Sequence, residues 1–590
     1  MKIFLNILSI LSVREKTIFY LIIMVGMLVS LLEILSFGSI IPIMELIFNP
    51  SDKNFIYKFE FLKDLLKDFS NKDKILIFVV FFTSALLLTN ILNLIFIWCS
   101  YYFCNNIAAI KSLELLSKYL NEPYIFHLKH SKNDLSSKIL IKIQNISDRI
   151  LYSFIIIFQK FALLSLYIFI ILLIDFEISF YFIFFVISFF LIINKFSKIK
   201  ISLYGKLFSE TVTDRMKILE NSFSGIKDII IFDNSNYFKN IFFNKAKAAA
   251  KYQAFNKSIS MSPKYFLEII ILICMAVVFY LFPNINETSI QNNVGIISFI
   301  IICSMRTLPG FQSIFMAFTD IKTFIESLNE CIKDLKKTNL FKSKSKKYYL
   351  NKNNFKIKKN ITLKNISAKI DNKDLLKNIN LSFEKNKIIC VIGKSGSGKS
   401  SLINIISGLI EPTKGAIYYD NKQVNGINLI TNSSLVSQST VLFEDTIYNN
   451  VSFGNKKIDI DEFNKVIKIS GLIDFYKKIK SNPNHIVKDS GKNFSGGEIQ
   501  RLGLARALTK NSSVILLDEF TSALDIENEK KIFQQIRKYK KNRLIIFTTH
   551  KLSLLKYADR VIGLKNSKIV LDIKNFNISS YKNKIKNLFN

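Results

Sequence analysis

The chain has 590 residues, too many for one ordinary domain, so two or three domains are expected. Its mean hydropathy of +0.26 is high for a soluble protein, and 81 Lys and Arg against 45 Asp and Glu give a formal charge of +36. A positive cytoplasmic face on a membrane protein explains this charge better than nucleic-acid binding. The six cysteines and four histidines show no spacing typical of disulfide frameworks or zinc sites, and no removable signal peptide is expected.

The first half of the chain carries the apolar sequence. Residues 2–12 alternate apolar and polar side chains at helical spacing, which predicts an entry helix on the membrane surface. Beyond it, several stretches are long and apolar enough to cross a bilayer, which requires roughly 20 residues. They predict six transmembrane helices, near residues 17–47, 75–105, 147–174, 177–196, 264–283 and 293–320.

The distribution of Lys and Arg predicts the orientation of these spans. Segments 106–146 and 197–260 are basic, whereas 175–177 and 283–293 contain no Lys or Arg. Loop 50–73 mixes both charges and does not contradict this pattern. The positive-inside rule therefore puts the two long basic loops and both termini in the cytoplasm. An all-α six-helix transmembrane domain is predicted for residues 1–325.

Two ionisable residues within the spans, Glu33 and Arg306, are candidates for contact with a transported substrate. A charged group in a membrane is costly and usually faces a cavity or a partner. The alternative is a structural ion pair or a position near the membrane surface. Pro42 and the segment 307–310 are expected to loosen their helices.

Beyond residue 320 the sequence changes character twice. Residues 326–360 are polar and rich in Lys, which predicts a basic linker. From 361 to 590, short apolar strands alternate with helices, a pattern typical of an α/β domain. The predicted architecture is therefore a helical membrane domain, a linker and an α/β domain.

The stretch "VIGKSGSGKS", residues 391–400, follows a predicted buried strand and precedes a helix. Its spacing is that of a phosphate-binding loop, whose glycines let backbone N–H groups surround phosphate oxygens beside a helix N-terminus. In such a loop Lys399 reaches the outer phosphates and the Ser400 hydroxyl joins the Mg²⁺ shell. The predicted ATP-binding residues are Gly393, Lys394, Ser395, Gly396, Ser397, Gly398, Lys399, Ser400 and Ser401.

A second apolar strand, "VILLDE" at 514–519, ends in two carboxylates. Asp518 is predicted to hold Mg²⁺, directly or through water. Glu519 is predicted to orient and polarise the attacking water. This pair predicts hydrolysis of ATP rather than binding alone.

The stretch "NFSGGEIQRLGLARAL", residues 493–508, resembles the signature of ABC transporter ATPases. The order of phosphate loop, signature, "VILLDE", "SALD" and a single His is also similar to that family over 361–575. With the predicted spans in front, the whole chain resembles a bacterial exporter-type half-transporter, in which membrane and ATPase domains are fused.

This resemblance implies roles for residues that the spacing alone does not define. In the family two ATPase domains close head to tail, so Ser495, Gly496 and Gly497 would contact the γ-phosphate bound by a second copy. Gln438 would touch Mg²⁺ and the membrane domain, and Asp525 would lie in the loop that crosses the dimer interface. His550 would contact the γ-phosphate.

The sequence departs from the family pattern at three positions. Phe494 and Glu498 replace the usual Leu and Gln, which are mild changes because Ser-Gly-Gly is intact. Ile370 occupies the position at which the family usually stacks an aromatic ring on adenine. Phosphate chemistry is expected to be unaffected, whereas adenine selectivity is open.

The resemblance also implies a dimer and a path of coupling. One chain supplies one membrane half and one ATPase, so a homodimer is predicted, with a heterodimer as the alternative. Glu519 and Ser-Gly-Gly are both present, which favours the homodimer. Segments 119–140 and 218–234 match the family's coupling helices and are expected to dock on the ATPase near Gln438.

Four short stretches, 30–47, 123–131, 225–232 and 305–314, resemble the lipid-linked oligosaccharide flippases of bacterial protein glycosylation. This predicts ATP-driven flipping of a lipid-linked glycan in the bacterial cytoplasmic membrane, with membrane lipid as a further partner and Arg306 pairing with the substrate pyrophosphate. Export of a lipid, a peptide or a drug-like amphiphile is the alternative. A membrane-bound regulatory ATPase is less favoured, and the six spans argue against a nucleic-acid partner.

Overall fold

The computed structural model describes residues 2–48, 69–174, 176–281, 287–336, 357–371, 373–453, 458–478, 482–488, 491 and 494–574, without the side chains of 2, 45, 48, 170–199, 267 and 270–306. The chain forms two compact units. A helical unit comprises residues 1–121 and 130–339, and an ATPase unit comprises 122–129 and 340–590.

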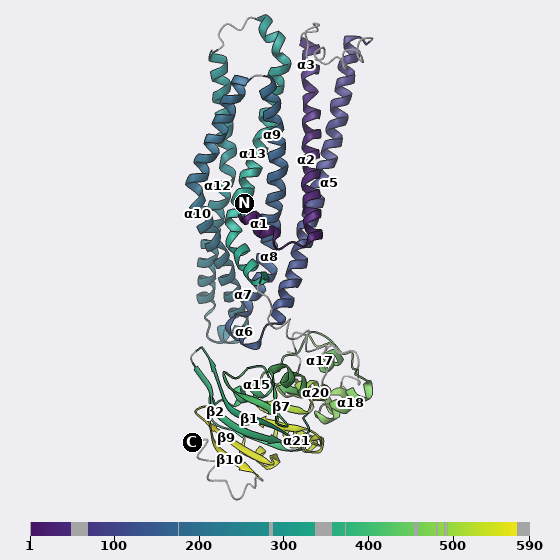
Figure 1. Ribbon diagram of the computed structural model, residues 1–590, viewed down its shortest axis with the longest axis vertical. Coiled ribbons are helices and arrows are strands. Elements are labelled where there is room, and N and C mark those ends of the chain that lie inside the picture. Colours follow the sequence, from purple (N-terminus) through teal and green to yellow (C-terminus); the bar gives the residue numbers. More distant parts are fainter. Residues whose placement is uncertain are drawn as a thin grey trace. The chain divides into compact units, whose positions relative to one another are not determined.

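The helical unit consists of long helices that pack side by side (Figure 1). Ser12 and Ser70 cap the helices α2 and α5 by accepting hydrogen bonds from backbone N–H groups in their first turns. Its elements are α1 (Lys2–Leu8), α2 (Val13–Gly38), α3 (Ile40–Phe48), α5 (Asn71–Leu120), α7 (Lys132–Ser137), α8 (Ile143–Asn145), α9 (Tyr152–Ile174), α10 (Phe176–Ser224), α11 (Ile226–Ile231), α12 (Ser235–Leu281) and α13 (Glu287–Lys336), with π-helical turns η2 (Lys138–Lys142) and η3 (Ile146–Leu151).

All six predicted spans lie largely within helices of this unit. In the part of the chain that was described, three helical segments are long and apolar enough to cross a membrane, Val13–Met44, Asn71–Leu120 and Lys132–Phe169. The total of six stays a prediction. Helix α13 runs unbroken through Pro309 and ends at Lys336, so the first residues of the predicted linker 326–360 are helical. The side chain of Arg306 lies outside the described residues.

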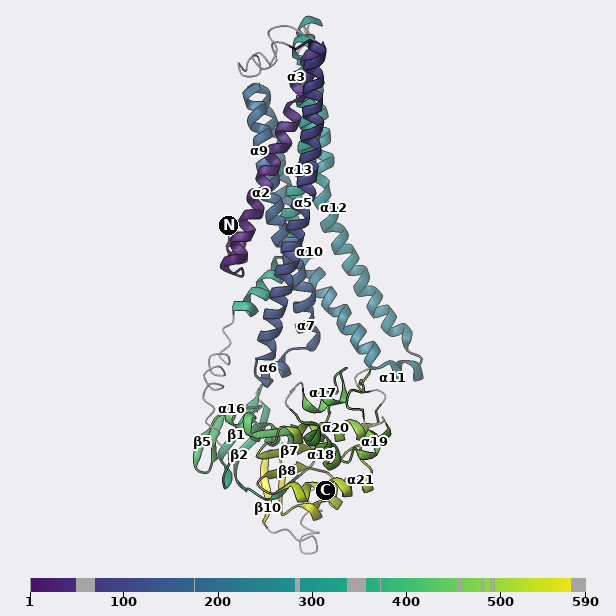
Figure 2. The same ribbon diagram turned by 90° about the vertical axis from the view of Figure 1, so that its right-hand side faces the viewer.

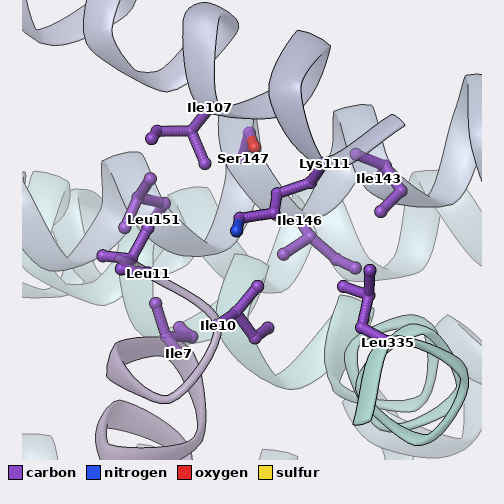
Figure 3. Close-up of a pocket in the computed structure, with 10 residues that line it drawn as sticks. All are labelled: Ile7, Ile10, Leu11, Ile107, Lys111, Ile143, Ile146, Ser147, Leu151 and Leu335. Carbon is purple, nitrogen blue, oxygen red and sulfur yellow. The ribbon is translucent and has the colours of Figure 1, made fainter. Parts of the chain in front are cut away.

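Helix α1 covers a small apolar cavity of about 30 Å³ at the side of the bundle (Figure 3). Ile7 and Leu11 are buried there against α5 and η3. The side chain of Lys111 reaches into this apolar setting, 3.2 Å from Glu114 and 3.8 Å from Glu15. The predicted entry helix is therefore packed on the bundle through its apolar face.

Helices α10 and α12 leave the bundle side by side and are joined by α11 (Figure 2). Gly205 lets α10 approach α13 closely, because a Cβ atom there would lie 2.3 Å from the carbonyl oxygen of Thr323. Asn256 of α12 donates a hydrogen bond of 3.3 Å to the hydroxyl of the same Thr323. Backbone proximity and a buried polar contact thus fix the crossing of three helices.

The ATPase unit is built on two sheets. An antiparallel sheet has the order β2-β1-β4-β5, and a six-stranded sheet has the order β10-β9-β3-β8-β7-β6, parallel except for β10. The strands are β1 (Asn360–Ile370), β2 (Lys373–Glu384), β3 (Ile388–Ile392), β4 (Lys414–Tyr419), β5 (Lys422–Val424), β6 (Ser433–Val436), β7 (Val514–Asp518), β8 (Leu544–Thr548), β9 (Arg560–Lys565) and β10 (Lys568–Lys574).

Helices cover the six-stranded sheet and complete two apolar cores. One core joins β1, β2 and β4 to α15 and one face of the larger sheet, and the other packs α18, α20 and α21 on further residues of that sheet. The helices are α6 (Tyr124–Lys129), α15 (Lys399–Ile406), α16 (Gly426–Asn432), α17 (Ile447–Ser452), α18 (Ile460–Ile469), α19 (Ile473–Lys478), α20 (Gly496–Thr509) and α21 (Ile526–Tyr539), with a 3-10 turn η5 (Leu552–Tyr557).

The short helix α6 belongs to the ATPase unit although it lies early in the chain. Ile125 packs on the core beneath β1 and β2, and the ammonium group of Lys129 lies 2.5 Å from a carboxylate oxygen of Asp371. Residues 122–129 of the predicted coupling segment are therefore part of the ATPase unit, with one contact at the turn between β1 and β2. Docking near Gln438 stays a prediction.

Candidate nucleotide site

The phosphate loop connects β3 to α15, as its sequence predicts. Gly393, Gly396 and Gly398 adopt positive φ angles of 155°, 78° and 106°. Residues that carry a Cβ atom rarely adopt such angles. A Cβ atom at Gly393 would also lie 2.3 Å from the carbonyl oxygen of Leu564. Gly393 and Gly398 are thus required by both backbone conformation and close packing, and Gly396 by backbone conformation alone. The loop leads directly into the N-terminus of α15, where an anion is favoured.

Lys399 occupies the centre of the loop with a side chain that is 5% exposed. Its ammonium group donates hydrogen bonds to the carbonyl oxygens of Gly393 at 2.9 Å and Lys394 at 3.2 Å. Burial lowers the pKa of Lys399 below its ordinary value and outweighs the opposing effect of Glu519. A buried cation with few anionic contacts is suited to bind a phosphate group.

The predicted catalytic residues meet at the carboxyl ends of adjacent parallel strands. A carboxylate oxygen of Glu519 lies 2.7 Å from Nε2 of His550 and 3.6 Å from the ammonium group of Lys399. The amide nitrogen of Gln438 donates to the other oxygen of Glu519 at 2.9 Å. Residues from β6, β7, β8 and the phosphate loop are therefore gathered around one carboxylate.

Thr548 is a residue that the sequence interpretation missed. Its hydroxyl accepts a hydrogen bond from the backbone N–H of Glu519 at 2.9 Å and donates to a carboxylate oxygen of Asp518 at 2.7 Å. Glu519 has a positive φ of 47°, so this bond holds a backbone conformation that a non-glycine residue rarely adopts. The available signal was its position two residues before His550 at the end of an apolar strand.

The donor atoms at this edge fit Mg²⁺. Ser400 offers a hydroxyl, Asp518 a carboxylate and Gln438 an amide oxygen, all hard oxygen ligands. Among the described residues no group of three His, Cys, Asp or Glu forms a dedicated metal cage. Mg²⁺ that binds nucleotides commonly takes one or two protein ligands and completes its shell with phosphate oxygens and water.

The signature residues form a different part of the unit. Ser495 caps α20 in a reciprocal capping box with Glu498, and Gly496 and Gly497 pack against Ala523. Asp525 caps α21 by accepting a hydrogen bond from the N–H of Asn528 at 2.9 Å. Among the described residues, no hydrogen bond or ion pair joins Ser495 or Asp525 to the phosphate loop.

Two further polar residues were not found from the sequence. Gln500 joins α20 to the "SALD" segment through hydrogen bonds with Ser522 and with the N–H of Ala523. The guanidinium carbon of Arg506 lies over the edge-to-face pair of Phe443 and Phe453, 5.4 and 5.1 Å from their ring centroids. It also donates to the backbone of the segment after Gln438. These contacts connect the signature helix to both neighbouring loops.

Fold and site together define a phosphate-loop ATPase fused to a bundle of long apolar helices. The ABC transporter transmembrane region model matches residues 16–307 and the ABC transporter model matches residues 376–522. The two matches cover about three quarters of the 590 residues. The chain belongs to the ABC transporters, as a fused half-transporter.

Similar proteins agree with this family. The chain is 31% identical to an "ATP-dependent lipid A-core flippase" of Wigglesworthia glossinidia brevipalpis, over 60% of this chain and 61% of that protein. It is 36% identical to "Alpha-hemolysin translocation ATP-binding protein HlyB" of Escherichia coli, over 36% of this chain and 31% of that protein. The chain thus spans about three fifths of the first relative's length and under a third of the second's.

A solved structure shares the fold over nearly the whole chain. The structure of a bacterial Atm1-family ABC exporter with ATP bound matches with a TM-score of 0.75 and 17% identity, over 97% of this chain and 96% of that chain. At this identity the likeness shows the fold alone, a helical domain and an ATPase domain in one chain.

Proposed function

We propose that the chain is an ATP-driven exporter of the bacterial cytoplasmic membrane that flips a lipid-linked oligosaccharide or a related lipid-anchored substrate. The observation that supports the ATPase is the cluster of Lys399, Gln438 and His550 around the carboxylate of Glu519. The fused transmembrane region supports the coupling of hydrolysis to transport. The ATPase domain lies in the cytoplasm, because the basic loops of the chain follow the positive-inside rule.

In the proposed mechanism Glu519 accepts a proton from, or orients, the attacking water. His550 and Gln438 hold the two oxygens of this carboxylate in a fixed position, and Thr548 fixes its backbone. Lys399 neutralises charge on the outer phosphates. Ser400, Asp518 and Gln438 would hold Mg²⁺, which would supply further neutralisation of charge on the phosphate oxygens.

A second copy of the chain completes each nucleotide site in this proposal. Ser495, Gly496 and Gly497 open the 14-residue helix α20, whose N-terminus is suited to an anion. Within one copy these residues make their own capping contacts rather than contacts with Lys399. Contact with the γ-phosphate of a partner copy gives them a ligand, with Asp525 at the same interface. The intact Glu519 and signature favour a homodimer over a heterodimer.

The substrate class is supported by two kinds of resemblance. The motifs near 30–47 and 305–314 are similar to those of lipid-linked oligosaccharide flippases, and one relative is named for flipping lipid A-core. Another relative is named for translocation of a protein toxin, so peptide export is the competing candidate. A lipid or a drug-like amphiphile is a further alternative.

The deciding experiment reconstitutes the purified full-length protein in liposomes with a fluorescent polyprenyl-pyrophosphate oligosaccharide. Flipping that requires ATP in the wild type and is absent in Glu519→Gln supports both the ATPase and the substrate class. A wild type that hydrolyses ATP without moving the glycan lipid removes the glycan assignment, and fluorescent peptides are then the next substrates to test. A protein that hydrolyses ATP but moves neither these two classes nor a fluorescent lipid or drug-like amphiphile supports the regulatory alternative.

A further inference from the structure

The helical unit contains a polar cavity of about 350 Å³ between η2, α10 and α13. This volume lies in the range of small-ligand sites. Lys206, Glu210 and Lys217 of α10 line one side, and Glu326 of α13 lines another. Hydroxyl groups of Ser209 and Thr213 add neutral hydrogen-bonding groups to the same wall.

Some of the charged side chains that line this cavity form ion pairs that connect its walls. Lys142 of η2 lies 2.6 Å from Glu330 of α13, and Lys138 lies 3.1 Å from Asp334. Both lysines belong to a π-helical turn, a rare conformation that is frequently found at functional sites. These ion pairs give η2 and α13 a fixed spacing on either side of the cavity.

Four other lining charges form no ion pair within the described part of the chain, namely Lys206, Lys217, Glu210 and Glu326. Two of them are cationic and two are anionic, so neither a plain anion nor a plain cation matches the lining. Ammonium groups bind phosphate, and carboxylates and hydroxyls bind the hydroxyl groups of a sugar. The set fits a ligand that carries both groups, a phosphorylated sugar.

The position of these residues along α10 suits a headgroup that hangs from the membrane. Lys206 follows the end of the predicted span 177–196 by ten residues, about 15 Å of helix. Its side chain leans back toward the helix N-terminus, and therefore toward the membrane. Lys217 lies eleven residues further, about 16 Å deeper. A lipid-anchored ligand has its pyrophosphate near the membrane and its sugars farther from it, in the same order as Lys206 and Lys217 along α10.

We propose that this cavity receives the phosphorylated sugar head of a lipid-anchored substrate before it crosses the membrane. Lys206 binds the phosphate nearest the lipid, Glu210 and Glu326 accept hydrogen bonds from sugar hydroxyls, and Lys217 binds an acidic group farther along the head. This inference rests on the proposed function and adds to it the residues that recognise the substrate.

The test measures binding to the full-length dimer in nanodiscs without ATP. Three probes separate the parts of the ligand: a farnesyl-pyrophosphoryl disaccharide, its water-soluble pyrophosphoryl disaccharide head, and farnesyl pyrophosphate. Lys206→Gln with Lys217→Gln is expected to raise Kd about tenfold or more for all three. Glu326→Gln is expected to raise Kd only for the two probes that carry sugars. Lys206→Arg is expected to retain the wild-type Kd.

The matched control is Lys239→Gln with Lys251→Gln, two exposed lysines of α12 outside the cavity lining. It should bind every probe as the wild type does. Size-exclusion elution of each variant shows whether it is folded. An unchanged Kd in the folded cavity variants overturns the proposal. Equal Kd values for the lipid-borne and free heads assign the cavity to a soluble phosphosugar and overturn the lipid-anchored assignment.

Flipping assays on the same preparations separate this inference from the proposed function. If the wild type flips the glycan lipid and the cavity variants bind the probes normally, the proposed function is retained and the proposed role of the cavity is overturned. If the wild type does not flip the glycan lipid but binds its head in a way that depends on Lys206, the proposed transport function is overturned and the cavity is supported as a binding site for the head.

Discussion

Four candidate catalytic side chains of the ATPase unit are gathered at one site, whereas four charged side chains of the helical unit line a cavity and form no ion pair among the described residues. The first group is held in place by strand ends and hydrogen bonds, so its geometry is set before any ligand arrives. In the second group Lys206, Glu210 and Lys217 are exposed on α10, and Glu326 of α13 is half-buried. In our proposal the reaction on ATP is therefore preorganised by the fold, whereas the transported substrate is contacted by side chains that a ligand must order.

Loss of the Glu519 carboxylate is expected to have the largest effect on the ATPase site. Glu519→Gln keeps the shape of the side chain but removes its charge and its capacity as a base. We expect ATP hydrolysis to fall about 10²–10⁴-fold, with ATP binding retained. Steady-state phosphate release and fluorescent-nucleotide binding measure the two quantities. A variant that hydrolyses ATP at the wild-type rate would assign the base to another residue.

The helical unit depends on close packing, which a single methyl group should reveal. Gly205→Ala places Cβ 2.3 Å from a backbone oxygen that cannot move without its helix. We expect a loss of stability of about 1–3 kcal/mol, seen as a lower melting temperature of the purified protein. Gly26→Ala is the control, because its Cβ meets the ring of Phe96 at 2.7 Å and a ring can turn away. Equal losses in both variants would contradict this account.

Thr548 tests the hydrogen bonds that support Glu519 and Asp518 from behind the ATPase site. Thr548→Val leaves the N–H of Glu519 without its acceptor and Asp518 without a donor. Because each of the two lost hydrogen bonds costs about 1 kcal/mol, hydrolysis should slow about 30-fold. Thr548→Ser keeps the hydroxyl and should stay within about twofold of the wild type, by the same reasoning. Rates that are equal in the Val and Ser variants would show that the hydroxyl is dispensable.

The smallest effect is expected at Asp420, far from the chemistry in sequence. Burial alone raises its pKa, but backbone N–H donors at Lys358, Lys359 and Asn360 outweigh it and hold the pKa below its ordinary value. Folding stability from this group is therefore present above the unfolded pKa of about 3.9 and lost as pH falls through the lower folded value.

Asp420→Asn should accordingly lower the local stability of β1 and β4 by about 1 kcal/mol at pH 7. Hydrogen exchange of these strands, compared at pH 7 and pH 3, measures the difference between variant and wild type. The difference should shrink at the lower pH. A difference that stays constant with pH would mean that the charge of Asp420 is not involved.

Much of the ATPase unit followed from the sequence because its motifs are contiguous. Glycines in the phosphate loop, the strand before Asp518 and the helix after Ser495 are all local patterns with one physical solution. The contact between α6 and Asp371 was not predicted, since it depends on which apolar surface fits Ile125. Thr548 and Gln500 were missed because their partners are 22 to 30 residues away.

The sequence by itself determined the two kinds of unit, the phosphate loop and the acidic strand end, because periodicity, glycine placement and charge act over a few neighbouring residues. Only the tertiary structure decided that Gln438, Glu519, His550 and Lys399 meet, and that charges from η2, α10 and α13 enclose a cavity. The order of strands in a parallel sheet and the crossing of long helices bring distant residues together. Those arrangements arise from packing of the whole chain, which no short stretch of sequence contains.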